Sequence, residues 1–315
     1  MNVEHILLAT DFSAHAERAE AYACSLAETW GAELTIMTVL EFDPGLNPDY
    51  PVTQLYLNEL MKQATQDLDA AKERVGERGI VVRPRLARGI PSKEIVAAAE
   101  EEKADLIVVG TAGKSGLEHV LLGSTAERVI RTSPCPVLAV RAERSETEGA
   151  GERQARPVLK KLLIPVDFSD CSLDALEYGI EAARRARASV TLLHVLEPVS
   201  YGLDFTLVHS DARRRREAVE KRLAEIAGAA NAAGVPCECL IRGGLPNDSI
   251  LEAARTLPID MIVMGTHGRR GLSHVLYGSV AESVLRKSLR PVLMVRSPKF
   301  RPSQRRALSA LPADQ

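Results

Sequence analysis

The sequence has few cysteines and few aromatic residues, and it has no long apolar run. Five cysteines and 4% aromatic residues in 315 residues argue against a disulfide scaffold and leave few platforms for stacking nucleobases. No stretch approaches the ~18 consecutive apolar residues of a transmembrane helix. Glu4 and Asp11 interrupt the first apolar run, so we expect no signal peptide. These absences predict a cytoplasmic protein with reduced thiols that binds neither membranes nor nucleic acid.

Charge is distributed unevenly along a chain of otherwise ordinary globular composition, with 45% hydrophobic and 26% charged residues. Residues 1–141 hold 14 basic and 21 acidic side chains, a net charge of −7, whereas residues 158–315 hold 23 and 17, a net charge of +6. Ordinary sequence divergence between two solvated surfaces is one interpretation of this difference. Electrostatic attraction between the halves, or between chains, is the alternative.

An internal repeat runs through the whole chain. Asp11-Phe12-Ser13 matches Asp167-Phe168-Ser169 at an offset of 156 residues, and the segment that begins at Ala104 matches the one that begins at Ile259 at an offset of 155. A repeat this long indicates a tandem domain duplication. We expect a first domain over residues 1–141, a flexible linker over 142–157, a second domain over 158–297 and a basic tail over 298–315.

Each copy alternates short apolar runs with amphipathic segments, which predicts buried parallel strands separated by helices. This alternation predicts an α/β fold, with helices on both faces of an open parallel sheet. Pro91 and Pro246 open short helices, for which Ser92 and Asn247 are the expected N-caps. The long helices are expected over Leu55–Arg78 and Asp211–Ala233. The strands are expected over Ile6–Ala9, Glu33–Leu40, Val81–Ala87, Asp105–Gly110 and Val137–Arg141, and over Leu162–Val166, Ser189–Leu196, Pro236–Ile241, Asp260–Gly265 and Val292–Arg296.

Glycines recur at fixed spacing after the fourth predicted strand of each copy. Glycine permits positive φ and a close approach of the backbone to a ligand. A serine that caps the next helix would present free N–H groups and the positive dipole end to an anion. Tight turns without a ligand are the alternative interpretation. The motif reads Gly110-x2-Gly113, nine residues and Gly123-Ser124, and in the second copy Gly265-x2-Gly268, nine residues and Gly278-Ser279.

Asp11 and Asp167 follow the first predicted strand of each copy. A carboxylate there can accept hydrogen bonds from a ribose hydroxyl or an adenine amine. The alternative is a cap on the following helix, shared with Ser13 or Ser169. Neither copy has the spacing of a P-loop.

Taken together, these residues give the chain a resemblance to a tandem universal stress protein. The similarity covers nearly all of both halves, and the G-x2-G-x9-G-S motif resembles the ATP-binding branch of that family. The resemblance implies two tandem parallel-sheet domains of the adenine nucleotide alpha hydrolase-like fold, with strand order 3-2-1-4-5. It also implies an internal pseudo-dimer of the repeats and a homodimer. The implied function is that of a stress-response sensor or regulator that binds ATP with Mg²⁺ and hydrolyses it slowly at most.

The resemblance assigns ligand contacts but no catalytic residue and no protein metal ligand. Asp11 and Asp167 would lie at the adenosine moiety, and Val39 and Val195 would contact adenine through backbone groups. The ribose and phosphates would be surrounded by Gly110, Gly113, Gly123, Ser124 and Thr125 in the first copy and by Gly265, Gly268, Gly278, Ser279 and Val280 in the second. Two alternatives stay open: an enzyme that uses ATP to adenylate or phosphorylate a small molecule, and a ligand-free interaction module. AMP or another adenosine ligand could also replace ATP.

Several reactive side chains have simpler interpretations. His119 and His274 occupy matching positions and are expected to be partly exposed, and His194 is expected to pack inside a strand. Cys237 and Cys239 share a face of a predicted strand but lack the neighbours of a zinc site.

Overall fold

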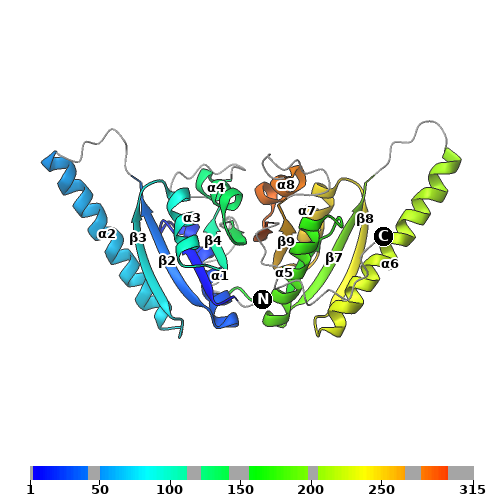
Figure 1. Cartoon of the computed structure of the whole chain (residues 1–315), viewed down its shortest axis with the longest axis horizontal. Helices are drawn as coiled ribbons and strands as arrows, with labels where there is room; N and C mark the ends of the chain where they lie inside the picture. Colours follow the sequence, from blue (N-terminus) through cyan, green and yellow to red (C-terminus); the bar gives the residue numbers. More distant parts are fainter. Residues whose placement is uncertain are drawn as a thin grey trace. The chain divides into compact units, whose positions relative to one another are not determined.

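The computed structural model describes residues 3–41, 50–111, 122–141, 156–197, 205–266 and 278–296. The chain divides into two compact units, an N-terminal unit over Asn2–Val158 and a C-terminal unit over Leu159–Gln315. Figure 1 shows the helices and strands of each. Gly113, Gly268, His119 and His274 lie outside the described residues, as do the expected tail and nearly all of the expected linker.

The described part of the N-terminal unit contains five parallel strands, which confirms the predicted open sheet. Their order is β3-β2-β1-β4-β5, as the resemblance implies. The central strand buries Ile6, Leu7 and Leu8 completely, which explains its continuous apolar sequence. The strands are β1 (His5–Ala9), β2 (Glu33–Leu40), β3 (Val82–Arg88), β4 (Leu106–Gly110) and β5 (Val137–Val140).

The described part of the C-terminal unit repeats this sheet. Its order is β8-β7-β6-β9-β10, which is the same topology counted from the first strand of the unit. The strands are β6 (Lys161–Pro165), β7 (Ser189–Leu196), β8 (Cys237–Gly243), β9 (Met261–Gly265) and β10 (Val292–Val295).

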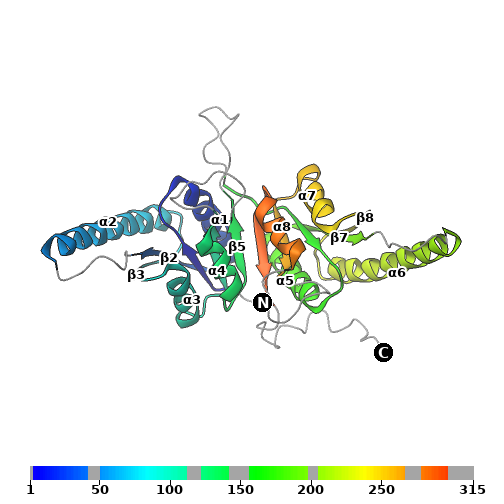
Figure 2. The same cartoon turned by 90° about the horizontal axis from the view of Figure 1, so that it is seen from above.

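Helices cover both faces of each sheet. In the N-terminal unit, α1 and α2 lie on one face, and α3 and α4 lie on the other (Figure 2). Their bounds are Ala14–Trp30, Pro51–Gly76, Pro91–Glu101 and Ser124–Thr132. The corresponding helices of the C-terminal unit are α5 (Asp170–Ala186), α6 (Phe205–Ala232), α7 (Pro246–Thr256) and α8 (Ser279–Lys287).

The prediction of Ser92 and Asn247 as N-caps is wrong. Helices α3 and α7 begin at their prolines, and the capping positions belong to Ile90 and Leu245. Proline is favoured at the first helical position because its φ is already helical and its missing N–H would have no partner there. The helix therefore starts one residue earlier than the polar side chain suggests.

The long helices also start earlier than predicted. Helix α2 begins at Pro51 instead of Leu55, and α6 begins at Phe205 instead of Asp211. The first turn of α2 again has a proline, which favours this start.

Candidate functional site

The carboxyl ends of β1 and β4 form the edge at which a ligand is expected. These strands are neighbours, but the helices that follow them lie on opposite faces of the sheet (Figure 2). Ligands of open α/β sheets bind at such a switch point. Asp11 follows β1 and Gly110 ends β4, so the structure brings these two predicted residues to one edge. In the C-terminal unit the same holds for Asp167 after β6 and Gly265 at the end of β9.

A hydrogen-bonded turn fixes each aspartate. Oδ1 of Asp11 accepts hydrogen bonds from the backbone N–H and the hydroxyl of Ser13, at 3.0 and 2.6 Å. Asp167 accepts the same pair from Ser169 at 3.0 and 2.5 Å. The serines are the N-caps of α1 and α5, so each aspartate supports the cap residue and does not cap the helix itself.

The residue between each aspartate and serine has a left-handed backbone. Phe12 has φ 56° and Phe168 has φ 61°, although both carry a Cβ. Such a conformation costs about 1–2 kcal/mol in an L-residue. Strain of this kind clusters at functional sites, where the surrounding structure maintains it. Here the bonds between aspartate and serine maintain it in both units.

Helices α4 and α8 begin at the same edge. The N–H of Gly123 donates to the carbonyl of Thr111 at 2.8 Å, and the N–H of Gly278 donates to Thr266 at 2.9 Å. Thr111 directly follows β4, so this bond places the start of α4 beside the end of that strand. The matching bond of Gly278 does the same for α8 and β9.

The prediction that Ser124 and Ser279 are capping residues is wrong. Gly123 and Gly278 occupy the N-cap positions, and each serine is the first residue of its helix. The expectation of positive φ is also wrong at these glycines, which have φ of −58° and −54°. Because the N-cap has no side chain, no capping group shields the first turn.

The first turns of α4 and α8 offer donors for an anion. The N–H groups of Ser124 and Thr125 have no partner within the helix, and those of Ser279 and Val280 are equivalent. Both serines are exposed. Free N–H groups and the positive end of the helix dipole favour phosphate or carboxylate groups.

Gly265 has a packing role that sequence reasoning missed. A Cβ at this position would lie 2.6 Å from the carbonyl oxygen of Cys171, in the first turn of α5. The absence of a side chain therefore lets α5 approach β9 closely. Only a contact between segments about a hundred residues apart reveals this role.

The predicted adenine contacts lie one strand further along the edge. Val39 and Val195 are half-buried near the ends of β2 and β7, which pair with β1 and β6. On the other side, Val39 pairs with Ala87 of β3, and Val195 pairs with Arg242 of β8.

The C-terminal unit has an additional cluster beside Asp167. His194 is buried, as predicted, and its Nδ1–H donates to the carbonyl of Val166 at 2.6 Å. Its ring stacks on Phe168 with centroids 5.0 Å apart, and the Arg222 guanidinium lies 4.4 Å from the centroid of that phenyl ring. By the offsets of the repeat, Thr38 takes the position of His194 in the N-terminal unit, and Asp67 takes that of Arg222. The two edges therefore differ in side-chain chemistry.

Burial suppresses the ionisation of three cysteine thiols. Burial raises the pKa of the Cys24 thiol to about 11 and that of Cys135 to about 12. Burial, reinforced by the nearby Cys239 and Glu238, raises the pKa of Cys237 to about 12. These thiols stay protonated at neutral pH and are weak nucleophiles.

The described residues contain neither a candidate metal cluster nor a helix suited to cross a membrane. No group of three or more histidine, cysteine, aspartate or glutamate side chains in that part of the chain could hold a metal ion. Of the helices described, none has the length and apolarity to cross a membrane.

Comparisons with known proteins agree over both units. A model of the universal stress protein family matches residues 2–141 and 159–296. Universal stress protein MJ0531 of Methanocaldococcus jannaschii is 38% identical over 142 residues, which cover 45% of this chain and 84% of that protein. Universal stress protein Rv2005c of Mycobacterium tuberculosis is 26% identical over 302 residues, which cover 92% of this chain and 96% of that protein. A solved universal stress protein from Archaeoglobus fulgidus has the same fold, with a TM-score of 0.65, 24% identity, and coverage of 94% of this chain and 97% of that one.

Proposed function

The chain belongs to the universal stress protein family, and we propose that each of its units binds an adenine nucleotide, with ATP as the principal ligand. One observation carries this proposal. In both units, a fixed aspartate and the uncapped start of a helix meet at the strand switch point, with nearly identical geometry. The aspartate suits a ribose or adenine donor, and the helix start suits the phosphates.

We propose a sensor or regulator, because the described residues of these edges suit binding better than catalysis. Oδ1 of Asp11 and of Asp167 is engaged by a serine, so neither aspartate resembles a poised general base. Nucleotide occupancy would then alter the surface or the assembly of the protein, with slow hydrolysis at most. Mg²⁺ would reach the site with the phosphates, which supply oxygen ligands that this ion prefers. The homodimer and the cytoplasmic location stay predictions.

The test uses two exposed serines at the helix starts. An aspartate in the first turn interacts favourably with the helix dipole, by about 0.3–1 kcal/mol, so Ser124→Asp and Ser279→Asp should fold. The same carboxylate repels a phosphate. We expect each single variant to lose one of two bound nucleotides per chain, and the double variant to lose both. Native mass spectrometry with Mg-ATP counts them directly.

Alanine provides the matched control. Ser124→Ala and Ser279→Ala leave the backbone N–H groups in place and add no charge, so they should keep both nucleotides. Undiminished ATP binding in the folded double aspartate variant would disprove the site. A folded wild-type chain without any nucleotide would disprove the function and favour a ligand-free interaction module.

A further inference from the structure

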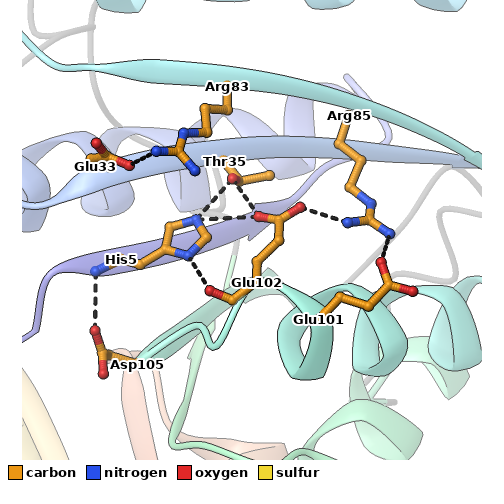
Figure 3. A network of polar contacts seen from close by, with 8 residues as sticks. All are labelled: His5, Glu33, Thr35, Arg83, Arg85, Glu101, Glu102 and Asp105. Carbon is orange, nitrogen blue, oxygen red and sulfur yellow. Dashed lines mark hydrogen bonds and ion pairs between the residues drawn. The ribbon is translucent and has the colours of Figure 1, made fainter.

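A buried histidine lies at the amino ends of the strands in the N-terminal sheet. The proposed nucleotide site lies at the other end of β1. His5 begins β1 and is only 9% exposed (Figure 3). Thr35 on β2 and Glu102 at the end of α3 face its ring. The backbone at this point is held by Asp105, whose Oδ2 accepts the N–H groups of Glu4 and His5 at 2.9 and 3.1 Å.

Both ring nitrogens of His5 face oxygen acceptors. Nδ1 lies 3.1 Å from the carbonyl oxygen of Glu102, which can only accept. Nε2 lies 2.8 Å from Oγ1 of Thr35 and 3.3 Å from Oε2 of Glu102. The Thr35 hydroxyl donates its single hydrogen to the same Glu102 carboxylate at 2.7 Å. A full set of hydrogen bonds therefore requires an N–H on each ring nitrogen, so the geometry fits an imidazolium.

Further charges keep Glu102 ionised beside this ring. Arg85 on β3 donates to Oε1 of Glu102 at 2.6 Å and to Glu101 at 2.5 Å (Figure 3). Burial acts to raise the pKa of the Glu102 carboxyl. Hydrogen bonds from Arg85 and Thr35, together with the charges of Arg85 and His5, outweigh burial and hold that pKa below its ordinary value. The carboxylate thus remains the counter-ion of the imidazolium.

The C-terminal unit has a lysine at the position of His5 and pairs it with a different glutamate. Lys161 begins β6, and its Nζ lies 2.6 Å from Oε1 of Glu238, which also accepts from the hydroxyl of Thr191 at 2.8 Å. Asp260 accepts the N–H groups of Lys160 and Lys161, both at 2.8 Å, just as Asp105 does for its strand. The cation and threonine keep their positions in the repeat, but the carboxylate comes from β8 instead of the end of α3. A lysine ammonium ordinarily keeps its proton well above neutral pH.

We infer that His5 is a proton-binding site that makes the amino edge of the N-terminal sheet sensitive to pH, while Lys161 leaves the C-terminal sheet insensitive. Loss of the His5 proton removes the charge that faces Glu102. It also leaves either Nε2 or the Glu102 carboxylate without a hydrogen, because the Thr35 hydroxyl can serve only one of them. The folded edge is therefore weakened as the pH rises. Histidine is the side chain that ordinarily changes charge between about pH 5 and 8, so the test covers that range. This inference does not depend on nucleotide binding.

Amide hydrogen exchange of the full chain tests the inference with matched reporters. The N–H of Asp105 donates to the carbonyl of His5, and the N–H of Asp260 donates to that of Lys161, both at 2.9 Å. Between about pH 5 and 8 we expect the protection factor of Asp105 to fall by about tenfold, the loss of one charge-assisted hydrogen bond. The protection factor of Asp260 should stay constant.

Variants exchange the two cations. His5→Lys should keep the Asp105 protection factor constant across this range. Lys161→His should make the Asp260 protection factor fall with rising pH, which tests the inference even where the first variant folds poorly. Equal pH dependence of Asp105 in the wild type and in His5→Lys, or no new dependence in a folded Lys161→His variant, would overturn it.

Discussion

At the scale of single residues, one missing side chain sets the distance between α5 and β9. A Cβ at Gly265 would lie 2.6 Å from the Cys171 carbonyl oxygen and 2.9 Å from its Sγ. Backbone atoms of a helix cannot move away as easily as the end of a flexible side chain. The helix must shift as a whole, or the strand must bend.

We therefore expect Gly265→Ala to destabilise the C-terminal unit by about 1–3 kcal/mol, the usual cost of overpacking. Urea unfolding monitored by circular dichroism measures the change. Gly228→Ala in α6 is the matched control, since no atom lies within 4 Å of a Cβ built there. Because alanine favours a helix interior over glycine, the control should gain up to about 1 kcal/mol. Equal stability of both variants would show that α5 can retreat at no cost.

At the scale of elements, α1 and α5 end in the same conformation with different residues. The C-cap of α1 is Gly31 with φ 66°, whereas that of α5 is Arg187 with φ 52°. The next N–H, from Ala32 or Ala188, donates to the carbonyl five residues earlier in both cases. Glycine adopts this left-handed backbone readily, but a residue with a Cβ does not.

Exchange of these C-cap residues should change the stabilities of the two units in opposite directions. We expect Arg187→Gly to stabilise the C-terminal unit by about 1 kcal/mol and Gly31→Arg to destabilise the N-terminal unit by a similar amount. Nothing lies within 4 Å of a Cβ at Gly31, so the cost there is conformational and not a clash. Differential scanning calorimetry of both variants provides the measurement. A lower stability of Arg187→Gly would mean that the arginine side chain contributes more than its backbone costs.

The element scale also shows what the sequence can predict. The positions of the strands are predictable because buried parallel strands leave short apolar runs. The order of the strands followed from the resemblance to the family and not from this pattern. The N-caps of α3 and α7 differ from the prediction because proline at the first helical position outweighs a polar residue after it. Within the first helical turn, a proline and a polar residue can each mark the start of the helix. The sequence pattern does not show which of the two does so.

Part of the candidate site is predictable for the same reason. Asp11 and Gly110 end neighbouring strands, so topology alone brings them together. The contact of Gly265 with Cys171 and the stack of His194 on Phe168 join residues from different elements. Sequence spacing carries no signal for such contacts, because they depend on the distance between packed elements.

At the scale of the whole molecule, each unit has five described strands and its own buried core. All five described strands of the N-terminal unit pair within that unit, and Ser25 donates to the carbonyl of Pro157 at its far end. Near the start of the C-terminal unit, the carbonyl of Lys160 accepts the N–H of Ser189. A domain that holds its own core can in principle fold alone.

We expect residues 1–158 and residues 159–315, produced separately, each to unfold in one cooperative transition. Circular dichroism and urea titration of the two fragments check this. The intact chain, purified alongside, is the reference for their combined signal. A fragment without a cooperative transition would show that its fold requires the other unit.

The difference between His5 and Lys161 has a consequence for how the chain could report its surroundings. A change in temperature or osmolyte concentration acts on the burial of apolar surface, which both units share. By the inference above, a change in proton concentration would act on the contact of His5 with Glu102 and not on that of Lys161 with Glu238. One unit of the duplicated chain would then respond to pH, and the other would provide an internal reference that does not respond.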